Sequence, residues 1–167
     1  MTTINYLAYG SNLLPARLAA RIAIRAVVGM VSLDDTRLAF HKRGADGSGK
    51  CTLLAAAGAQ AYGVVYRIDT ADKVTLDRIE GLGHGYRVEW LCDAVLGECF
   101  FYRAEEAALD AGLQPFDWYH AYVLAGARHH GLPAEYVAAI AAVATRVDGD
   151  AGRRAENYAR LTRHPER

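Results

Sequence analysis

The sequence predicts a single α+β domain, built as a small mixed β-barrel with flanking helices. Its 167 residues are 52% apolar and 23% charged, which is enough to form one hydrophobic core. Strand-like segments dominate the middle of the chain without regular strand–helix alternation, and the last third is helical. We place the domain at residues 1–147. Residues 148–167 form a polar, arginine-rich C-terminal tail, either frayed or partly helical.

The first element is a strand that turns through glycine into a helix. Residues 4–9 favour a strand, and Gly10 ends it. Ser11 and Asn12 are typical N-caps for a helix over residues 13–22. Such a turn points free backbone N–H groups at one spot, which predicts an anion or oxyanion site. The alternative is an ordinary strand-to-helix turn with no ligand.

The middle and end of the chain supply the remaining elements. Residues 42–50 (KRGADGSGK) form a polar, glycine-rich loop that we expect to be mobile. The other elements, in chain order, are strands at 26–33, 36–41, 51–57 and 61–68, a helix at 70–80, a hairpin of 86–96 with 98–103, and helices at 118–130 and 134–147.

Glu80 occupies an unfavourable position at the end of the predicted helix 70–80. The last helical turn carries partial negative charge, so a carboxylate there costs about 0.3–1 kcal/mol. This field favours the neutral acid, and the glycine-rich residues 81–85 follow directly. Proton transfer near neutral pH requires such a group, so Glu80 is a candidate general acid and base. The alternative is a solvated glutamate with no chemical role.

Composition excludes several classes of function. Nineteen basic and nineteen acidic side chains cancel, so we expect neither a nucleic-acid nor a membrane partner. The chain shows no signal segment and no apolar run of membrane-spanning length, so we expect a cytoplasmic protein. The three cysteines lack metal-like spacing, and the adjacent His129 and His130 diverge on their helix, so no metal site is predicted.

Four short motifs occur along the chain in a characteristic order. They are YLAYGSN at 6–12, GVVY at 63–66, LDRIEG at 76–81 followed by Gly85-Tyr86, and Tyr119 followed by Gly126-Ala127 and GLPAEY at 131–136. Together they resemble the γ-glutamylcyclotransferase family of the AIG2-like superfamily, from about Tyr6 to Tyr136. The resemblance implies that family's fold, and it places Glu80 at the family's catalytic acid.

The resemblance also implies a reaction. Members of the family cleave γ-glutamyl amides, with the substrate's own α-amine attacking its γ-carbonyl. The products are 5-oxoproline and a free amine or amino acid, a lyase-like outcome that needs no cofactor or enzyme nucleophile. Glu80 would move the protons, and the loop would hold the substrate. The implied substrate-binding residues are Tyr6, Leu7, Ala8, Tyr9, Gly10, Ser11, Asn12, Tyr86 and Tyr119.

Some side chains near this site stay ambiguous. Tyr6 and Tyr9 are three residues apart on one strand, so at most one should face the pocket. Without the resemblance, Tyr119 is equally well explained as a half-buried aromatic residue on the helix at 118–130. The face formed by Arg17, Arg21 and Arg25 is expected to be solvated surface, with attraction of a carboxylate substrate as the alternative. No lysine is expected within reach of the turn.

Three hypotheses remain open for the function. The first is a cyclotransferase acting on a γ-glutamyl amino acid or amine. The second, on the same fold, releases a γ-glutamyl protecting group in a biosynthetic pathway, where the amine belongs to a larger metabolite, and the relaxed region 42–57 favours it. The third is a non-catalytic module on the same fold that binds a metabolite or has a regulatory role. The apolar C-terminal helices could also pair in a homodimer.

Overall fold

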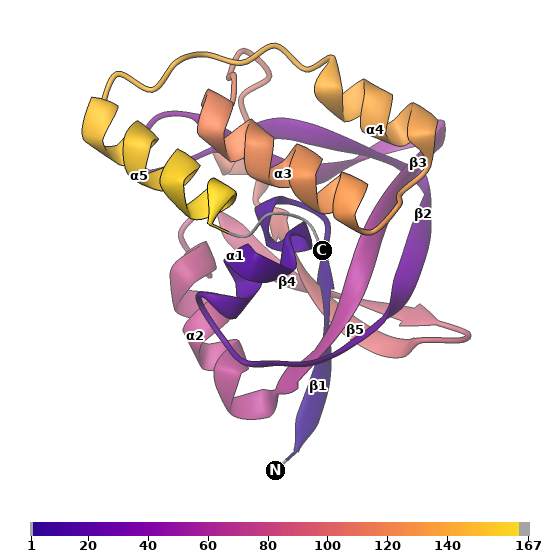
Figure 1. The fold of residues 1–167 in the computed structure, drawn as a ribbon. Coiled ribbons are helices and arrows are strands. Elements are labelled where there is room, and N and C mark those ends of the chain that lie inside the picture. Colours follow the sequence, from indigo (N-terminus) through magenta and orange to yellow (C-terminus); the bar gives the residue numbers. More distant parts are fainter. Residues whose placement is uncertain (1, 164–167) are drawn as a thin grey trace.

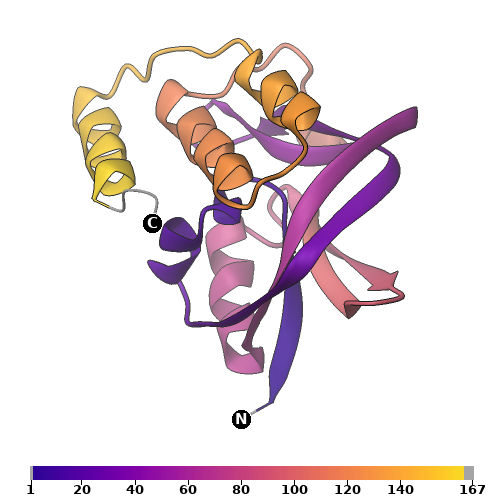
Figure 2. The ribbon, with the colours of Figure 1, turned by 45° about the vertical axis from the view of Figure 1, so that its right-hand side comes forward.

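The computed structural model describes residues 2–163 (Figure 1). Single turns of 3-10 helix lie at η1 (Ser11–Leu13) and η2 (Glu106–Ala108). The other elements are β1 (Thr3–Ala8), α1 (Pro15–Ala19), β2 (Ile24–Arg43), β3 (Gly49–Asp69), α2 (Thr70–Glu80), β4 (Tyr86–Asp93), β5 (Gly97–Ala104), α3 (Asp117–His129), α4 (Ala134–Ala141) and α5 (Ala151–Thr162). Helices α3, α4 and α5 gather at the end of the molecule opposite the start of β1 (Figure 2).

The five strands form one sheet in the order β2-β3-β1-β5-β4. Strand β1 is antiparallel to β3 and parallel to β5. The first part of β3 also approaches the end of β5: the Ala104 N–H donates to Thr52 Oγ1 at 3.0 Å, and Arg103 Nη1 donates to the Leu53 carbonyl at 2.8 Å. The α+β class with flanking helices is confirmed. The closed barrel is not: within the described residues, side-chain bonds and no backbone ladder join this seam.

Strands β2 and β3 form one long hairpin, where the sequence predicted four shorter strands. The ladder shifts register between Asp34 and Thr36 and then continues. Asp35 takes a left-handed φ of 51°, and its carboxylate accepts a hydrogen bond from the Gly58 N–H at 2.8 Å. The turn-like Asp34-Asp35 pair therefore produces a bulge inside a continuous strand.

The turn between β2 and β3, predicted to be mobile, is closed by hydrogen bonds. The Gly44 N–H donates to the Ser48 carbonyl at 2.8 Å. The Asp46 carboxylate accepts from the Ser48 hydroxyl and from the Lys50 ammonium, each at 2.7 Å. Lys42 and Lys50 are partners across the ladder, so their side chains point to the same face of the hairpin.

The helical predictions hold best where local signals are strong. Helix α2 lies as predicted and ends at Gly81 with a φ of 72°. Helix α4 stops at Ala141, earlier than predicted, because the next segment pairs with the chain before α3. There the Arg146 N–H donates to the Pro115 carbonyl, and the Arg146 carbonyl accepts from the Asp117 N–H, each at 3.0 Å.

The segment from Asp148 onward contains helix α5. The Asp148 carboxylate is fully buried and accepts from Trp118 Nε1 at 2.8 Å and from the Arg153 guanidinium at 2.6 Å. The Arg153 guanidinium holds the pKa of Asp148 well below its usual range. These bonds fasten α5 to α3. Residues 164–167 of the predicted tail lie outside the described residues.

The core brings α3 against the loop that follows β1. Leu13 of this loop is fully buried in the same hydrophobic core as Val123 and Ala127 of α3. A Cβ atom added to Gly126 would lie 2.5 Å from Leu13 Cβ and 2.5 Å from the Leu14 nitrogen. Only glycine permits this approach, so helix α3 directly supports the backbone of the loop.

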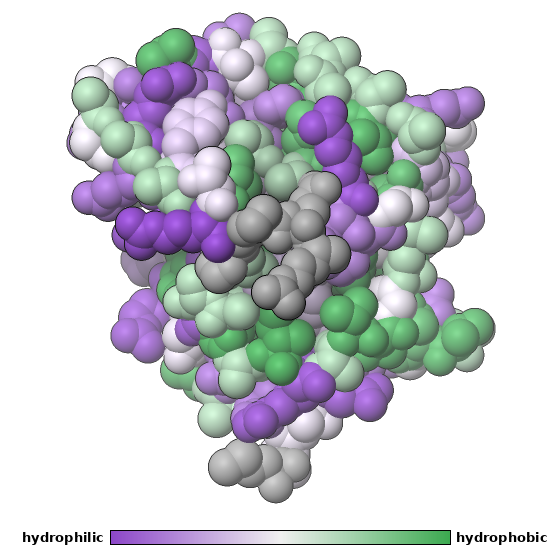
Figure 3. Space-filling model, in the orientation of Figure 1, coloured by the Kyte–Doolittle hydropathy of each residue, from purple (hydrophilic) through white to green (hydrophobic). Residues whose placement is uncertain are grey.

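Part of the surface is apolar. In Figure 3, hydrophobic residues gather at the lower right, over the β4–β5 hairpin. Exposed apolar side chains of this hairpin and of β2 include Val27, Met30, Trp90 and Val95. None of the four lines the cavities described below. Among the described residues, no helix is both long and apolar enough to cross a membrane.

Candidate active site

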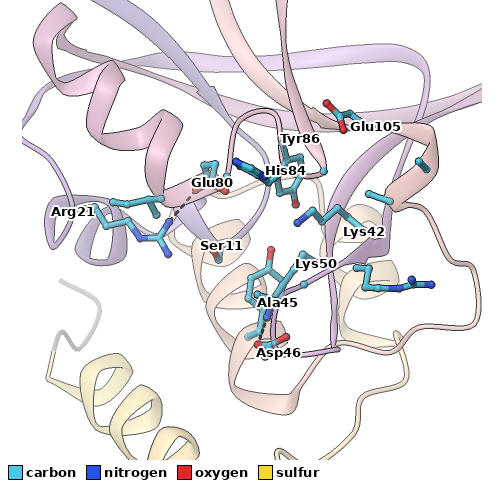
Figure 4. A pocket seen from close by; sticks show the side chains of 18 of the residues that line it. Ser11, Arg21, Lys42, Ala45, Asp46, Lys50, Glu80, His84, Tyr86 and Glu105 are labelled. Atoms are coloured by element: carbon cyan, nitrogen blue, oxygen red, sulfur yellow. Dashed lines mark hydrogen bonds and ion pairs between the residues drawn. The ribbon is translucent and has the colours of Figure 1, made fainter.

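A cavity of about 720 Å³ opens where the loop after β1, the end of α2, the β2–β3 turn and α3 meet (Figure 4). A small recess of about 30 Å³ adjoins it. The recess is lined by Tyr6, Tyr9, Gly10, Ser11, Asn12, Cys51, Glu80, Tyr86, Tyr102 and Tyr119. Ser11, Glu80, Tyr86 and Tyr119 line both spaces, so cavity and recess form one site.

The loop presents unpaired backbone donors to the recess. Within the described residues, the N–H groups of Gly10, Ser11 and Asn12 make no hydrogen bond. Gly10 is required because an added Cβ atom would lie 2.9 Å from Cys51 Cβ. Gly10, Ser11 and Asn12 all line the recess, so the three unpaired donors lie in its wall.

Asn12 links the loop to the acid. Its Nδ2 donates to the Tyr6 hydroxyl and to Glu80 Oε1, each at 3.0 Å, and its Oδ1 accepts from Arg21 Nη1 at 3.1 Å. The predicted helix caps are therefore wrong. Ser11 and Asn12 lie inside the 3-10 turn, no side chain caps η1 or α1, and the Asn12 amide serves the site instead.

Glu80 is the last residue of α2, as predicted, and faces the site. Arg21 Nη1 lies 3.0 Å from its Oε1, and both side chains are about one-fifth exposed. Arg21 and Asn12 both donate to the same carboxylate oxygen, Oε1. The arrangement holds a carboxylate at a fixed point with its second oxygen free of these two bonds.

Tyrosines form much of the wall. Burial raises the pKa of Tyr6, Tyr9, Tyr86 and Tyr119, so their hydroxyls stay protonated at neutral pH. The Tyr86 hydroxyl donates to the Cys51 carbonyl at 2.6 Å, and the Tyr119 hydroxyl accepts from the Cys51 N–H at 3.1 Å. Both rings are therefore locked to β3.

Both Tyr6 and Tyr9 line the recess, although strand alternation predicted that only one could. Strand β1 ends at Ala8, so Tyr9 lies beyond the alternating segment. Its hydroxyl donates to the Tyr102 carbonyl. Leu7 and Ala8 line neither the cavity nor the recess and are fully buried in the core, so this geometry offers them no contact with a ligand.

Several cations at the cavity were missed. Arg17 and Arg21 line it and are not solvated surface; Arg25 is about half exposed and pairs with Asp69. Lys42 and Lys50 also line it, contrary to the expectation that no lysine reaches the turn. The sequence shows two lysines within residues 42–50, but it does not show that the pairing of β2 with β3 brings these lysines to the site.

His130, which follows α3, contacts the backbone of the loop after β1. His130 Nε2 lies 2.6 Å from the Tyr66 hydroxyl and 2.9 Å from the Leu13 carbonyl. Burial lowers the pKa of His130. Neither His129 nor His130 lines the cavity, and the described residues contain no group of His, Cys, Asp and Glu side chains that could hold a metal ion.

Comparisons with known proteins point to one family. The model of the AIG2-like family matches residues 60–140. The γ-glutamylcyclotransferases of Bos taurus and Homo sapiens are 28% and 29% identical over 138 residues, which cover 78% of this chain and 73% of each relative.

Solved structures agree on the fold. A structure described as a γ-glutamyl cyclotransferase superposes with a TM-score of 0.81 at 24% identity, covering 98% of this chain and 100% of that one. The crystal structure of an uncharacterized human protein gives a TM-score of 0.77 at 26% identity, covering 87% and 90%.

Proposed function

Because this chain belongs to the AIG2-like family of γ-glutamylcyclotransferases, we propose that it is a cyclotransferase that releases 5-oxoproline from a γ-glutamyl amide. One observation carries the proposal. The Glu80 carboxylate and the three unpaired N–H groups of the loop border the same small recess, joined by the Asn12 amide. An acid–base group and an oxyanion site at one point are what intramolecular acyl transfer requires.

The reaction forms one C–N bond and breaks another. The α-amine attacks the γ-carbonyl carbon and closes a five-membered lactam ring. Collapse of the tetrahedral intermediate then breaks the bond to the departing amine. Because nucleophile and electrophile belong to one molecule, a site that holds the glutamyl group folded exploits a large effective molarity. No water is consumed.

Glu80 moves the proton in this scheme. The α-ammonium first loses one proton to solvent. As the neutral α-amine attacks, the Glu80 carboxylate takes one of its two remaining protons and then gives it to the departing nitrogen, so the lactam keeps one N–H and the departing amine leaves neutral. Arg21 and Asn12 keep Oε1 in place through both steps. Such transfers contribute about 10²–10⁴-fold to the rate.

The loop stabilises the developing charge. The N–H groups of Gly10, Ser11 and Asn12 are held by the glycine contact with β3 and by helix α3, so they need no reorganisation during the reaction. The buried tyrosine rings around them exclude water and strengthen these interactions.

The test is incubation of the pure protein with a panel of γ-glutamyl amino acids and γ-glutamyl amines, with mass detection of 5-oxoproline. At least one compound should yield it. Glu80→Gln should lower the rate about 10²–10⁴-fold. Glu98→Gln, at an exposed position on β5, is the matched control and should keep the wild-type rate.

Two outcomes would contradict the proposal. A folded Glu80→Gln variant with the wild-type rate would remove Glu80 from the chemistry. Failure of every compound to react would leave the non-catalytic module, which thermal stabilisation by an unreacted γ-glutamyl compound would then support.

A further inference from the structure

Lys42 projects into the cavity from the wall across from the Glu80–Arg21 pair (Figure 4). The residue is only 8% exposed. Its Nζ lies 4.6 Å from the centre of the Tyr86 ring. Within the described residues, this ammonium forms no hydrogen bond and no ion pair, and Glu105, which also lines the cavity, is not bonded to it.

Three of the other cations of the cavity, Arg21, Arg43 and Lys50, have a carboxylate partner, and Arg17 has none within the described residues. Arg21 is paired with Glu80 at 3.0 Å, and Lys50 with Asp46 at 2.7 Å. Arg17 has no carboxylate partner, but its guanidinium stacks 4.2 Å from the Tyr122 ring. Among the described residues, Lys42 and Arg17 are thus the cavity cations without a carboxylate partner, and each lies over a tyrosine ring instead.

The backbone around Lys42 leaves room for its side chain to reach the cavity. A Cβ atom added to Gly85 would lie 3.0 Å from Lys42 Cε and 3.3 Å from its Nζ. Gly85 has a φ of 113°, so glycine is favoured there and leaves room for the lysine stem. A nearly buried ammonium without a partner is costly, and an anion in the cavity would relieve that cost.

The expected orientation of the substrate in the site indicates which of its anionic groups lies near Lys42. If the proposed function is correct, the α-amine meets Glu80, and the glutamyl α-carboxylate on the same carbon stays near the Arg21 side. The departing group projects from the γ-carbonyl toward the wider cavity. Lys42 lines that cavity but not the recess.

We propose that Lys42 is a specificity-determining residue whose ammonium binds a carboxylate on the departing half of the substrate. This inference rests on the proposed function. It selects among the departing groups that the sequence leaves open: an amino acid with a free carboxylate is preferred over an uncharged amine.

Three probes separate the possibilities: γ-glutamyl-alanine, γ-glutamyl-alaninamide and γ-glutamyl-ethylamine. All three share the glutamyl half, and the first two differ only in charge. The wild-type protein should show a kcat/KM for γ-glutamyl-alanine about 10–100-fold above the other two, as expected for loss of one charged hydrogen bond. Lys42→Met should bring this ratio close to one by slowing only γ-glutamyl-alanine, and Lys42→Arg should restore part of it.

Arg128→Met removes an exposed charge from α3 and should leave the ratio unchanged. A wild-type ratio near one would overturn the inference without any variant. An equal loss for all three probes in Lys42→Met would also overturn it, since Lys42 would then serve the glutamyl half. Absence of 5-oxoproline from every probe would instead overturn the proposed function, and this inference with it.

Discussion

Replacing Gly126 with alanine tests whether helix α3 fixes the loop that carries the backbone donors. The added Cβ would lie 2.5 Å from Leu13 Cβ and from the Leu14 nitrogen. Carbon atoms in contact prefer about 3.5–4.0 Å, so helix and loop must separate by about 1 Å. Overpacking of this kind costs about 1–3 kcal/mol, and the better helix propensity of alanine returns about 1 kcal/mol. The net loss of unfolding free energy is therefore about 0–2 kcal/mol.

Urea unfolding measures the first effect. With a slope of about 2 kcal/mol per M, the midpoint should fall by up to about 1 M. A displacement of about 1 Å at the donors should also lower 5-oxoproline formation by about 100-fold. Gly152→Ala is the matched control, because Gly152 lies in α5 and its nearest contact to an added Cβ is Asp150 Oδ1 at 3.4 Å. It should be neutral or slightly stabilising. A Gly126→Ala protein with unchanged midpoint and turnover would refute the supporting role of α3.

Three further predictions concern stability. Tyr119→Phe leaves the buried Cys51 N–H without its acceptor, so the free energy of unfolding should fall by about 1–3 kcal/mol in urea titrations. Asp148→Asn removes the charge that Arg153 and Trp118 bind, and calorimetry should show a Tm lower by about 4 °C, with no change if α5 docks independently of this residue. Burial lowers the pKa of His130, so the unfolded chain takes up its proton first. The contribution is complete above about pH 6.5 and is lost as the pH falls through that value toward the folded pKa. His130→Gln should flatten the dependence of stability on pH between about 7 and 5, and equal slopes for both proteins would contradict this assignment.

The sequence predicted best what neighbouring residues determine. The end of α2 follows from Gly81, which takes the left-handed conformation, and this alone places Glu80 at a helix terminus. The glycine turn after β1 was also predictable. Its helix was not, because the Asn12 side chain is engaged by Tyr6, Glu80 and Arg21, from three separate parts of the chain.

Features set by distant pairing could not be read from local patterns. The lysines of residues 42–50 reach the site only because β2 and β3 stay paired past the bulge at Asp35. A turn signal of two aspartates gives no indication that the strand continues. Likewise, Arg17 and Arg21 form a helical stripe that resembles solvated surface until α2 brings Glu80 against it.

The Asn12 amide has only one workable orientation. In the observed arrangement its nitrogen faces the Glu80 carboxylate and its oxygen faces the Arg21 guanidinium. A half-turn about the last side-chain bond would set oxygen against carboxylate and N–H against guanidinium, two repulsive contacts at once. The negative charge of Glu80 on one side and the positive charge of Arg21 on the other therefore fix the orientation of the Asn12 amide. The free protein holds the connection between loop and acid in register before any ligand arrives.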